Sequence, residues 1–212
     1  RSNIFSFEIG WRQFHALGKE RGKSMLSSLE QSLRQSSAIA EVSRASDSPV
    51  HLESTHSGSI EFDGLPEGSE PTVTKLNADE HFADLFQLEL AEGRWFEAGN
   101  SSDADNVLLN ETAARELGLP QPWLGQRFSI YGSQGRVIGV LRDFNFLPLQ
   151  ERMTPLVIYN SADWRGNYFV KTLPGQSSKA LAAAETAWKQ WFPERPFEFT
   201  FLDEDFNKMY QT

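Results

Sequence analysis

The apolar run that ends at Leu141 is followed by charged, polar and aromatic side chains. These residues are Arg142, Asp143, Phe144, Asn145 and Phe146, with Pro148 shortly after them. Charged groups at the end of a buried strand are a common place for general acid–base chemistry. The same residues fit a structural joint, in which polar side chains satisfy backbone groups and the phenylalanines pack. Both readings start from the same stretch of sequence.

Other carboxylates lie close together near residues 93–96, whose sequence is GRWF. Glu89, Glu92 and Glu97 flank this segment. A glycosidase needs two such groups that face each other across a cleft. Nothing in the spacing fixes such a pair, so a solvated acidic face is the better interpretation.

The histidines do not have the spacing of a metal site. His51 and His56 are five residues apart, which is not the i,i+4 pairing of a helical zinc site. Residues 103–106 begin like a calcium loop but lack its glycine and its final glutamate. The chain has no cysteine, which excludes thiolate chemistry and cysteine zinc sites. We therefore predict no metal and no cofactor.

The overall charge of the chain argues against one class of partner. The formal net charge is −9 and the sequence pI is near 5.0, which argues against nucleic acid as a partner. No segment approaches the roughly 18 consecutive apolar residues that a membrane helix needs. Because the chain opens on Arg1 rather than Met, we expect a piece of a longer protein.

Each end of the chain shows a strand–helix–strand pattern. At the first end, residues 3–9 and 40–50 read as strands around an amphipathic helix marked by Met25, Leu26, Leu29 and Leu33. At the second end, strands at 167–173 and 197–202 enclose a helix at 177–192, with Ser177 or Ser178 as its N-cap. Two such units can form one split βαβ sheet.

The middle of the chain has a different pattern. The sequence predicts strands within 57–64, 71–78 and 106–110, short helices at 79–88 and 111–118, and a hairpin at 126–141. Asn110 suits the cap of the second short helix. We therefore expect an α+β protein with a discontinuous subdomain, residues 1–77 plus 151–212, and an inserted mixed subdomain, residues 78–150. The strand at 156–159 is expected to rejoin the first subdomain, and residues 203–212 to form a final helix.

Four segments in this order resemble one protein family. They are residues 73–96 with their E-G-R-x-F turn, residues 106–118, the hairpin and D-F-x-F segment within 124–159, and residues 197–210. Together they resemble the extracytoplasmic domain of MacB-type and FtsX-like ABC transporter permeases. The resemblance covers about residues 72–212.

The resemblance implies a porter-like split βαβ subdomain with a sabre-like insertion, at the periplasmic face of the bacterial inner membrane. It implies a non-catalytic domain that transmits ATP-driven conformational change to a periplasmic substrate or partner. Its expected partners are the flanking transmembrane helices of the permease, a periplasmic adaptor or other protein, and a second copy in a dimeric transporter. In the loop 160–167, Trp164 and Arg165 are the candidate partner-binding residues. The joint between the subdomains would then contain Arg142, Asp143, Phe144, Asn145, Phe146 and Pro148.

Two other functions remain as alternatives. One is a hydrolase that uses carboxylates near residues 94–97 or 142–146. The other is a stand-alone domain that binds a small ligand in an enclosed apolar pocket of at least ~300 Å³.

Overall fold

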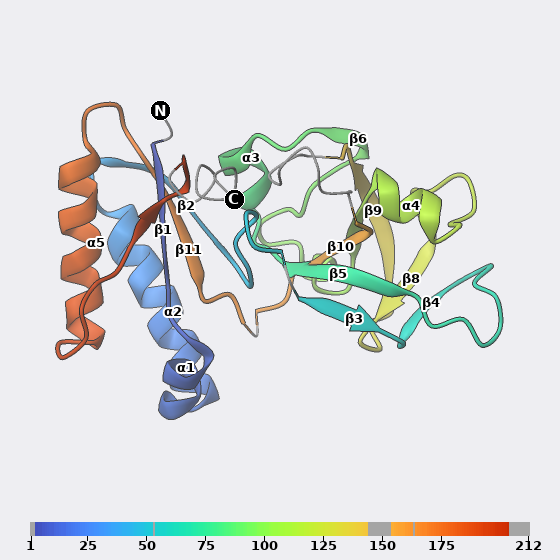
Figure 1. The fold of residues 1–212 in the computed structure, drawn as a ribbon, viewed down its shortest axis with the longest axis horizontal. Coiled ribbons are helices and arrows are strands. Elements are labelled where there is room, and N and C mark those ends of the chain that lie inside the picture. Colours follow the sequence, from blue (N-terminus) through green and yellow to red (C-terminus); the bar gives the residue numbers. More distant parts are fainter. Residues whose placement is uncertain (1–2, 53, 144–153, 163, 204–212) are drawn as a thin grey trace, which may run out of the picture. The chain divides into compact units, whose positions relative to one another are not determined.

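The computed structural model describes residues 3–52, 54–143, 154–162 and 164–203. The chain divides into two compact units (Figure 1). Unit 1 consists of residues 1–46 with 163–212, and unit 2 consists of residues 47–162. Among the described residues, no helix combines the length and apolar character needed to cross a membrane.

Unit 1 is a four-stranded antiparallel sheet with two long helices. Its elements are β1 (Ile4–Glu8), α1 (Trp11–Leu17), α2 (Lys19–Arg34), β2 (Ile39–Ala45), β11 (Asn167–Thr172), α5 (Ser177–Trp191) and β12 (Thr200–Phe201). The strand order is β12-β1-β11-β2. Since β1 and β2 both pair antiparallel with β11, they run parallel to each other with a strand from the other chain end between them. This interleaving is the split βαβ arrangement that the sequence predicts.

The core of unit 1 lies between the sheet and its helices. Figure 1 shows α2 and α5 beside each other on one face of this sheet, and the two helices are in contact. Phe5, Phe7 and Tyr168 contribute the sheet side of this core, and Leu29 and Trp188 contribute the helix side. The Tyr168 hydroxyl donates a hydrogen bond of 2.6 Å to the Leu26 carbonyl, so this buried polar group has a partner. Burial raises the pKa of the Tyr168 phenol.

The outer edge of β2 is covered by side chains. The Arg34 guanidinium donates to the carbonyl of Val42, and the backbone N–H of Val42 donates to Glu41 Oε1. Arg34 also pairs with Glu30 and Glu41. These contacts satisfy backbone groups that an unprotected edge strand would offer to another chain.

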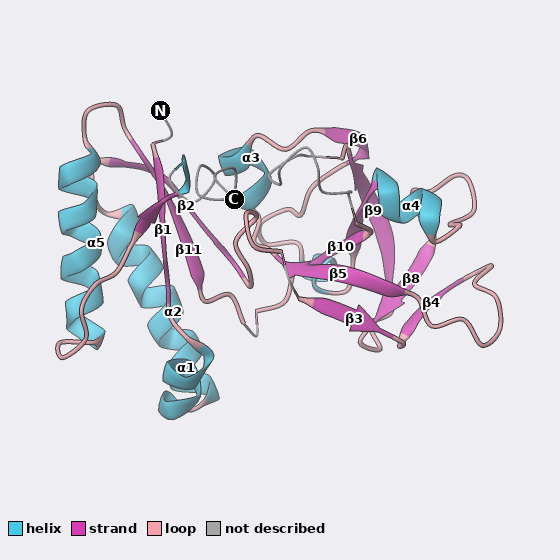
Figure 2. Ribbon diagram, viewed as in Figure 1, coloured by secondary structure: helices cyan, strands magenta, loops and turns pink. Residues whose placement is uncertain are grey.

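Unit 2 is built mainly from strands (Figure 2). Its elements are β3 (Thr55–Ser57), β4 (Ile60–Phe62), β5 (Thr72–Asn77), α3 (Phe82–Phe86), β6 (Leu90–Gly93), a 3₁₀ turn (Ser101–Ala104), β7 (Val107–Asn110), α4 (Glu111–Glu116), β8 (Arg127–Ile130), β9 (Gly135–Leu141) and β10 (Leu156–Tyr159). The strand order is β3-β5-β10-β7-β9-β8-β4, with β6 on β9.

The two outermost strands of this sheet are consecutive in the chain. Gly58 and Ser59 lie between β3 and β4 and both have positive φ angles, 72° and 50°. Because β3 pairs with β5 and β4 pairs with β8, one bent segment joins both ends of the strand order. The sheet therefore closes on itself around an apolar core that includes Phe62 and Phe128.

The observed division differs from the expected subdomain boundaries. Residues 47–77 and 154–162 belong to unit 2, although the sequence pattern favoured the first subdomain for them. The strand 156–159 is the clearest case, since β10 lies between β5 and β7 rather than in the sheet of unit 1. Its sequence LVIY is apolar throughout, and such a run predicts a buried strand without indicating which sheet it joins.

Two further local expectations need correction. The helix α5 begins at Ser177 after Gln176, which makes no side-chain capping bond, so neither Ser177 nor Ser178 is the N-cap. The segment 10–22, which the sequence pattern leaves unassigned, forms the short helix α1 and the start of α2. The expected helix at 203–212 lies almost wholly outside the described residues.

Candidate protein-interaction surface

An aromatic cluster lies at one end of unit 1, where α1 and the loop before β11 meet. We call Trp11, Phe14, His15 and Trp164 the aromatic tip. The Trp164 ring centroid is 5.2 Å from that of Trp11 and 5.1 Å from that of Phe14, both in edge-on geometry. The His15 ring meets Trp11 edge-on at 3.9 Å. The tip thus joins residues that are about 150 positions apart in sequence.

Close backbone approaches hold the aromatic tip in place. The backbone N–H of Ile9 donates to the Gly166 carbonyl at 2.9 Å, which ties the loop to the end of β1. A Cβ atom at Gly166 would lie 2.5 Å from both the Ile9 carbonyl oxygen and the Trp164 ring. A Cβ atom at Gly22 would lie 2.7 Å from the Phe14 ring. Only glycine fits at these two positions without displacing the aromatic rings.

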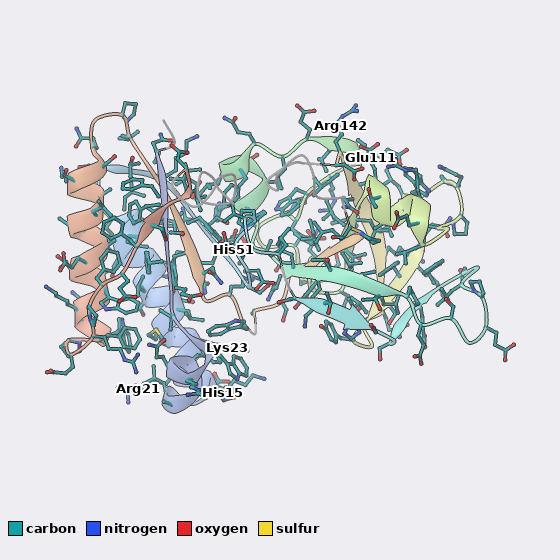
Figure 3. All side chains as sticks on the ribbon, viewed as in Figure 1. His15, Arg21, Lys23, His51, Glu111 and Arg142 are labelled. Carbon is teal, nitrogen blue, oxygen red and sulfur yellow. The ribbon has the colours of Figure 1, made fainter. Side chains whose placement is uncertain are left out.

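The aromatic tip is partly exposed, and basic residues lie close to it in the sequence. Trp11 is 52% exposed although it contacts three other rings. Residues 11–23 contain four basic side chains and one acidic side chain, in a chain whose net charge is −9. Figure 3 shows His15, Arg21 and Lys23 at this same end of unit 1. An exposed tryptophan on a rigid base is the usual anchor of a protein interface.

The structure brings one predicted binding residue into this surface and adds another. Trp164 is part of the aromatic tip, and Arg165 follows it in the same loop, half-buried. Trp11 and His15 were missed because they lie in a segment with no clear periodicity. The i,i+4 spacing of Trp11 and His15 is the signal that could have placed both on one helix face.

Asp143 acts as a structural group within unit 2. Its carboxylate accepts hydrogen bonds from the backbone N–H and the hydroxyl of Thr112, at 3.1 and 2.8 Å, and from Arg115 at 3.3 Å. Arg142 lies 3.7 Å from Glu89, and Figure 3 shows its side chain pointing outward near Glu111. The first turn of α4 is therefore held by the end of β9.

The expected joint between subdomains is only partly described. Arg142 and Asp143 lie inside unit 2, whose boundaries fall at 46/47 and 162/163. Phe144, Asn145, Phe146 and Pro148 lie outside the described residues. A joint role for these four residues stays a prediction.

The E-G-R-x-F segment is held inside unit 2 by close packing and hydrogen bonds. Gly93 has φ 75°, and a Cβ atom there would lie 2.2 Å from the Ile138 carbonyl oxygen. Arg94 binds Asp103 through two hydrogen bonds of 2.9 and 3.0 Å. The Trp95 indole donates to the Asp79 carbonyl at 3.0 Å, and Phe96 is buried. The motif is thus explained by packing and hydrogen bonding.

The carboxylates considered for catalysis near residues 93–96 lie beside arginines or are exposed to solvent. Glu89 pairs with Arg142, Glu97 lies 3.5 Å from Arg94, and Glu92 is exposed. None of the three lines the groove of about 450 Å³ that the structure shows on unit 2. Within the described ranges, no group of three or more His, Asp or Glu side chains is placed to hold a metal ion.

The fold is that of extracytoplasmic transporter domains. The periplasmic region of MacB from Actinobacillus actinomycetemcomitans matches with a TM-score of 0.68 at 18% identity, over 99% of this chain and 94% of that chain. The extracellular domain of the noncanonic ABC-type transporter YknZ from Gram-positive bacteria matches with a TM-score of 0.59 at 13% identity, over 93% and 97%. A domain of a putative permease protein from Porphyromonas gingivalis matches with a TM-score of 0.55 at 19% identity, over 80% and 78%.

The family assignment rests on the sequence itself. The family described as MacB-like periplasmic core domain matches residues 5–187, and the chain belongs to this family. It is therefore a periplasmic domain of a MacB-like, membrane-embedded ABC transporter permease. Comparison with curated proteins finds no match.

Proposed function

We propose that this domain is a non-catalytic element that passes ATP-driven conformational change to a periplasmic partner protein, which it contacts through the aromatic tip. The observation that carries the proposal is Trp11, half-exposed on a base of packed rings. Such a surface is already ordered before a partner arrives, so binding costs little conformational entropy. The positive charge around the tip favours a partner with an acidic surface.

The rest of the domain supports a mechanical role. The tip lies where β1, α1 and the start of β11 meet, and β1 is paired with β11 along its full length. A displacement of the sheet of unit 1 would therefore carry the tip with it, because packed elements move as rigid bodies. In the full transporter, we expect two copies of the domain, in line with a dimeric permease.

The test uses the full-length transporter in its native membrane. Trp11→Ala is expected to reduce transport by roughly tenfold, the effect of losing one interface anchor. ATP hydrolysis in the absence of the partner should stay unchanged, because the proposed role of the tip is to contact the partner and not to take part in hydrolysis. Leu173→Ala is the matched control, since Leu173 is an exposed apolar residue of unit 1 outside the tip.

Two results would contradict the proposal. Transport that is equal in Trp11→Ala and Leu173→Ala would show that the tip contacts no partner. A loss of transport accompanied by an equal loss of folded protein would show that Trp11 serves stability alone. Circular dichroism of the isolated domain distinguishes the second result from an interface effect.

A further inference from the structure

A polar groove on unit 2 carries two arginines that form no ion pair among the described residues. The groove has a volume of about 450 Å³ and lies over the face of β4, β8 and β9 that points away from the core of unit 2. Its polar lining includes Glu61, Asp63, Arg127, Ser129, Gln134 and Arg136. The volume is within the range of ligand sites, roughly 300–1,000 Å³, but the lining is charged rather than apolar.

The two arginines face each other across neighbouring strands. Arg127 on β8 is the direct cross-strand partner of Arg136 on β9. Like charges in this position destabilise a sheet. Arg136 donates one hydrogen bond of 2.8 Å to the Gly125 carbonyl. Within the described part of the chain, neither guanidinium forms an ion pair with a carboxylate, although Glu61 and Asp63 line the same groove.

We propose that this groove binds a single carboxylate side chain presented by an extended segment of a partner protein. A carboxylate placed between Arg127 and Arg136 would accept hydrogen bonds from both guanidinium groups and remove their repulsion. Ser129 and Gln134 offer the hydrogen-bonding groups that a peptide backbone needs beside it. This site is separate from the aromatic tip and does not depend on it.

Glu61 and Asp63 select against a run of acidic residues. They are two positions apart in the chain, so both side chains point to the groove side of the segment that begins with β4. Their charges would repel further carboxylates on the ligand. The groove thus favours an isolated Asp or Glu with neutral or basic neighbours over a polyacidic tail.

The test measures binding and stability in the 212-residue chain. The probe is a blocked peptide Gly-Ser-Glu-Ser-Gly, and the same peptide with Gln in place of Glu is its control. Titration followed by amide chemical shifts should show the Glu peptide binding at β8 and β9 about tenfold more tightly than the Gln peptide. Arg127→Gln should abolish this difference, whereas Arg142→Gln, a surface arginine of unit 2 outside the groove, should leave it intact.

Stability provides a second and independent readout. Arg127→Gln should raise the Tm of the free chain by roughly 1–3 °C at low salt, and the gain should shrink at high salt as screening weakens the repulsion. A lower Tm at low salt would show that Arg127 already has a counter-charge and would overturn the proposal. Equal binding of the Glu and Gln peptides, or an unchanged preference in Arg127→Gln, would also overturn it.

Discussion

At the scale of the residue, Asp103 is a carboxylate whose role is structural. Its side chain is almost fully buried and accepts hydrogen bonds from Arg94, from the backbone N–H of Glu97 and from Asn106. Burial alone opposes ionisation, but these hydrogen bonds outweigh it and hold the pKa of Asp103 below its ordinary value. The residue is therefore ionised across the neutral range and is a poor general acid.

The Asp103 network predicts a defined dependence of stability on pH. Since its folded-state pKa is below the unfolded-state value, ionised Asp103 adds stability above about pH 4, and this contribution is lost as the pH falls through the folded pKa. Asp103→Asn is expected to lower the free energy of unfolding at pH 7 by about 2–3 kcal/mol. The difference from the unsubstituted chain should narrow towards pH 3. Urea unfolding at both pH values measures it.

Asp105 supplies the control for this prediction. It lies two residues away, is exposed, and makes no described side-chain contact. Asp105→Asn should change stability by less than about 0.5 kcal/mol at either pH. Equal effects of the two substitutions would mean that the Arg94–Asp103 contact contributes nothing particular to unit 2.

At the scale of elements, Asn110 connects a strand, a helix and a second strand. Its Oδ1 accepts hydrogen bonds from the backbone N–H groups of Ala113 at 2.8 Å and Leu156 at 3.0 Å, and its Nδ2 donates to the Thr154 carbonyl at 2.9 Å. It therefore caps α4 and fixes the start of β10 with one fully buried side chain.

Removing this side chain should cost more than the loss of an ordinary helix cap. Asn110→Ala leaves buried backbone groups without partners, so we expect a loss of about 2–4 kcal/mol in the free energy of unfolding. Asn100→Ala is the matched comparison, because Asn100 caps the 3₁₀ turn through an exposed hydrogen bond from the Ser102 N–H. Asn100→Ala should lower the free energy of unfolding by less than about 1 kcal/mol. Chemical denaturation of both variants measures these free energies. Similar losses of stability in the two variants would refute the connecting role of Asn110.

The sequence predicts most elements but not their tertiary partners. The periodicity of Met25, Leu29 and Leu33 and the cap at Asn110 correctly predict α2 and α4, because these signals are local. The partners of the strand 156–159 are set by packing between distant segments, which an apolar run does not encode. Within the candidate surface, Trp164 was predicted, whereas Trp11 required the structure, because a seven-residue helix gives too short a pattern to recognise.

At the scale of the whole molecule, unit 2 is inserted at a hairpin position of unit 1. Ala45 at the end of β2 pairs with Asn167 at the start of β11, and Asn167 donates to the Ser46 carbonyl at 3.0 Å. The insertion thus leaves and re-enters unit 1 at neighbouring points. In most sheets of this kind, a short turn would join such strands.

This arrangement predicts that unit 1 folds without unit 2. Deletion of residues 47–162, with a short glycine-containing turn in their place, should leave a chain that unfolds cooperatively and retains the circular dichroism of two long helices. The same deletion combined with Phe7→Ala, which removes a core ring, should unfold at markedly lower denaturant concentration. A deletion variant without a cooperative transition would show that unit 1 depends on unit 2.

The strand order of unit 1 also imposes an order of assembly on the growing chain. In the described sheet, β1 and β2 pair only with strands that begin at or after residue 167. Ile4, for example, can pair only after Lys171 has been synthesised. Unit 2 is a continuous segment that is complete by residue 162, and its folding brings the two halves of unit 1 together and lowers the entropy cost of closing so long a loop. Pulsed hydrogen exchange during refolding should therefore protect amides of β7 and β9 before those of β1, and the reverse order would contradict this sequence. Substitutions that slow the folding of unit 2 are then expected to delay the folding of unit 1 as well. Substitutions that slow the folding of unit 1 should leave the folding rate of unit 2 unchanged.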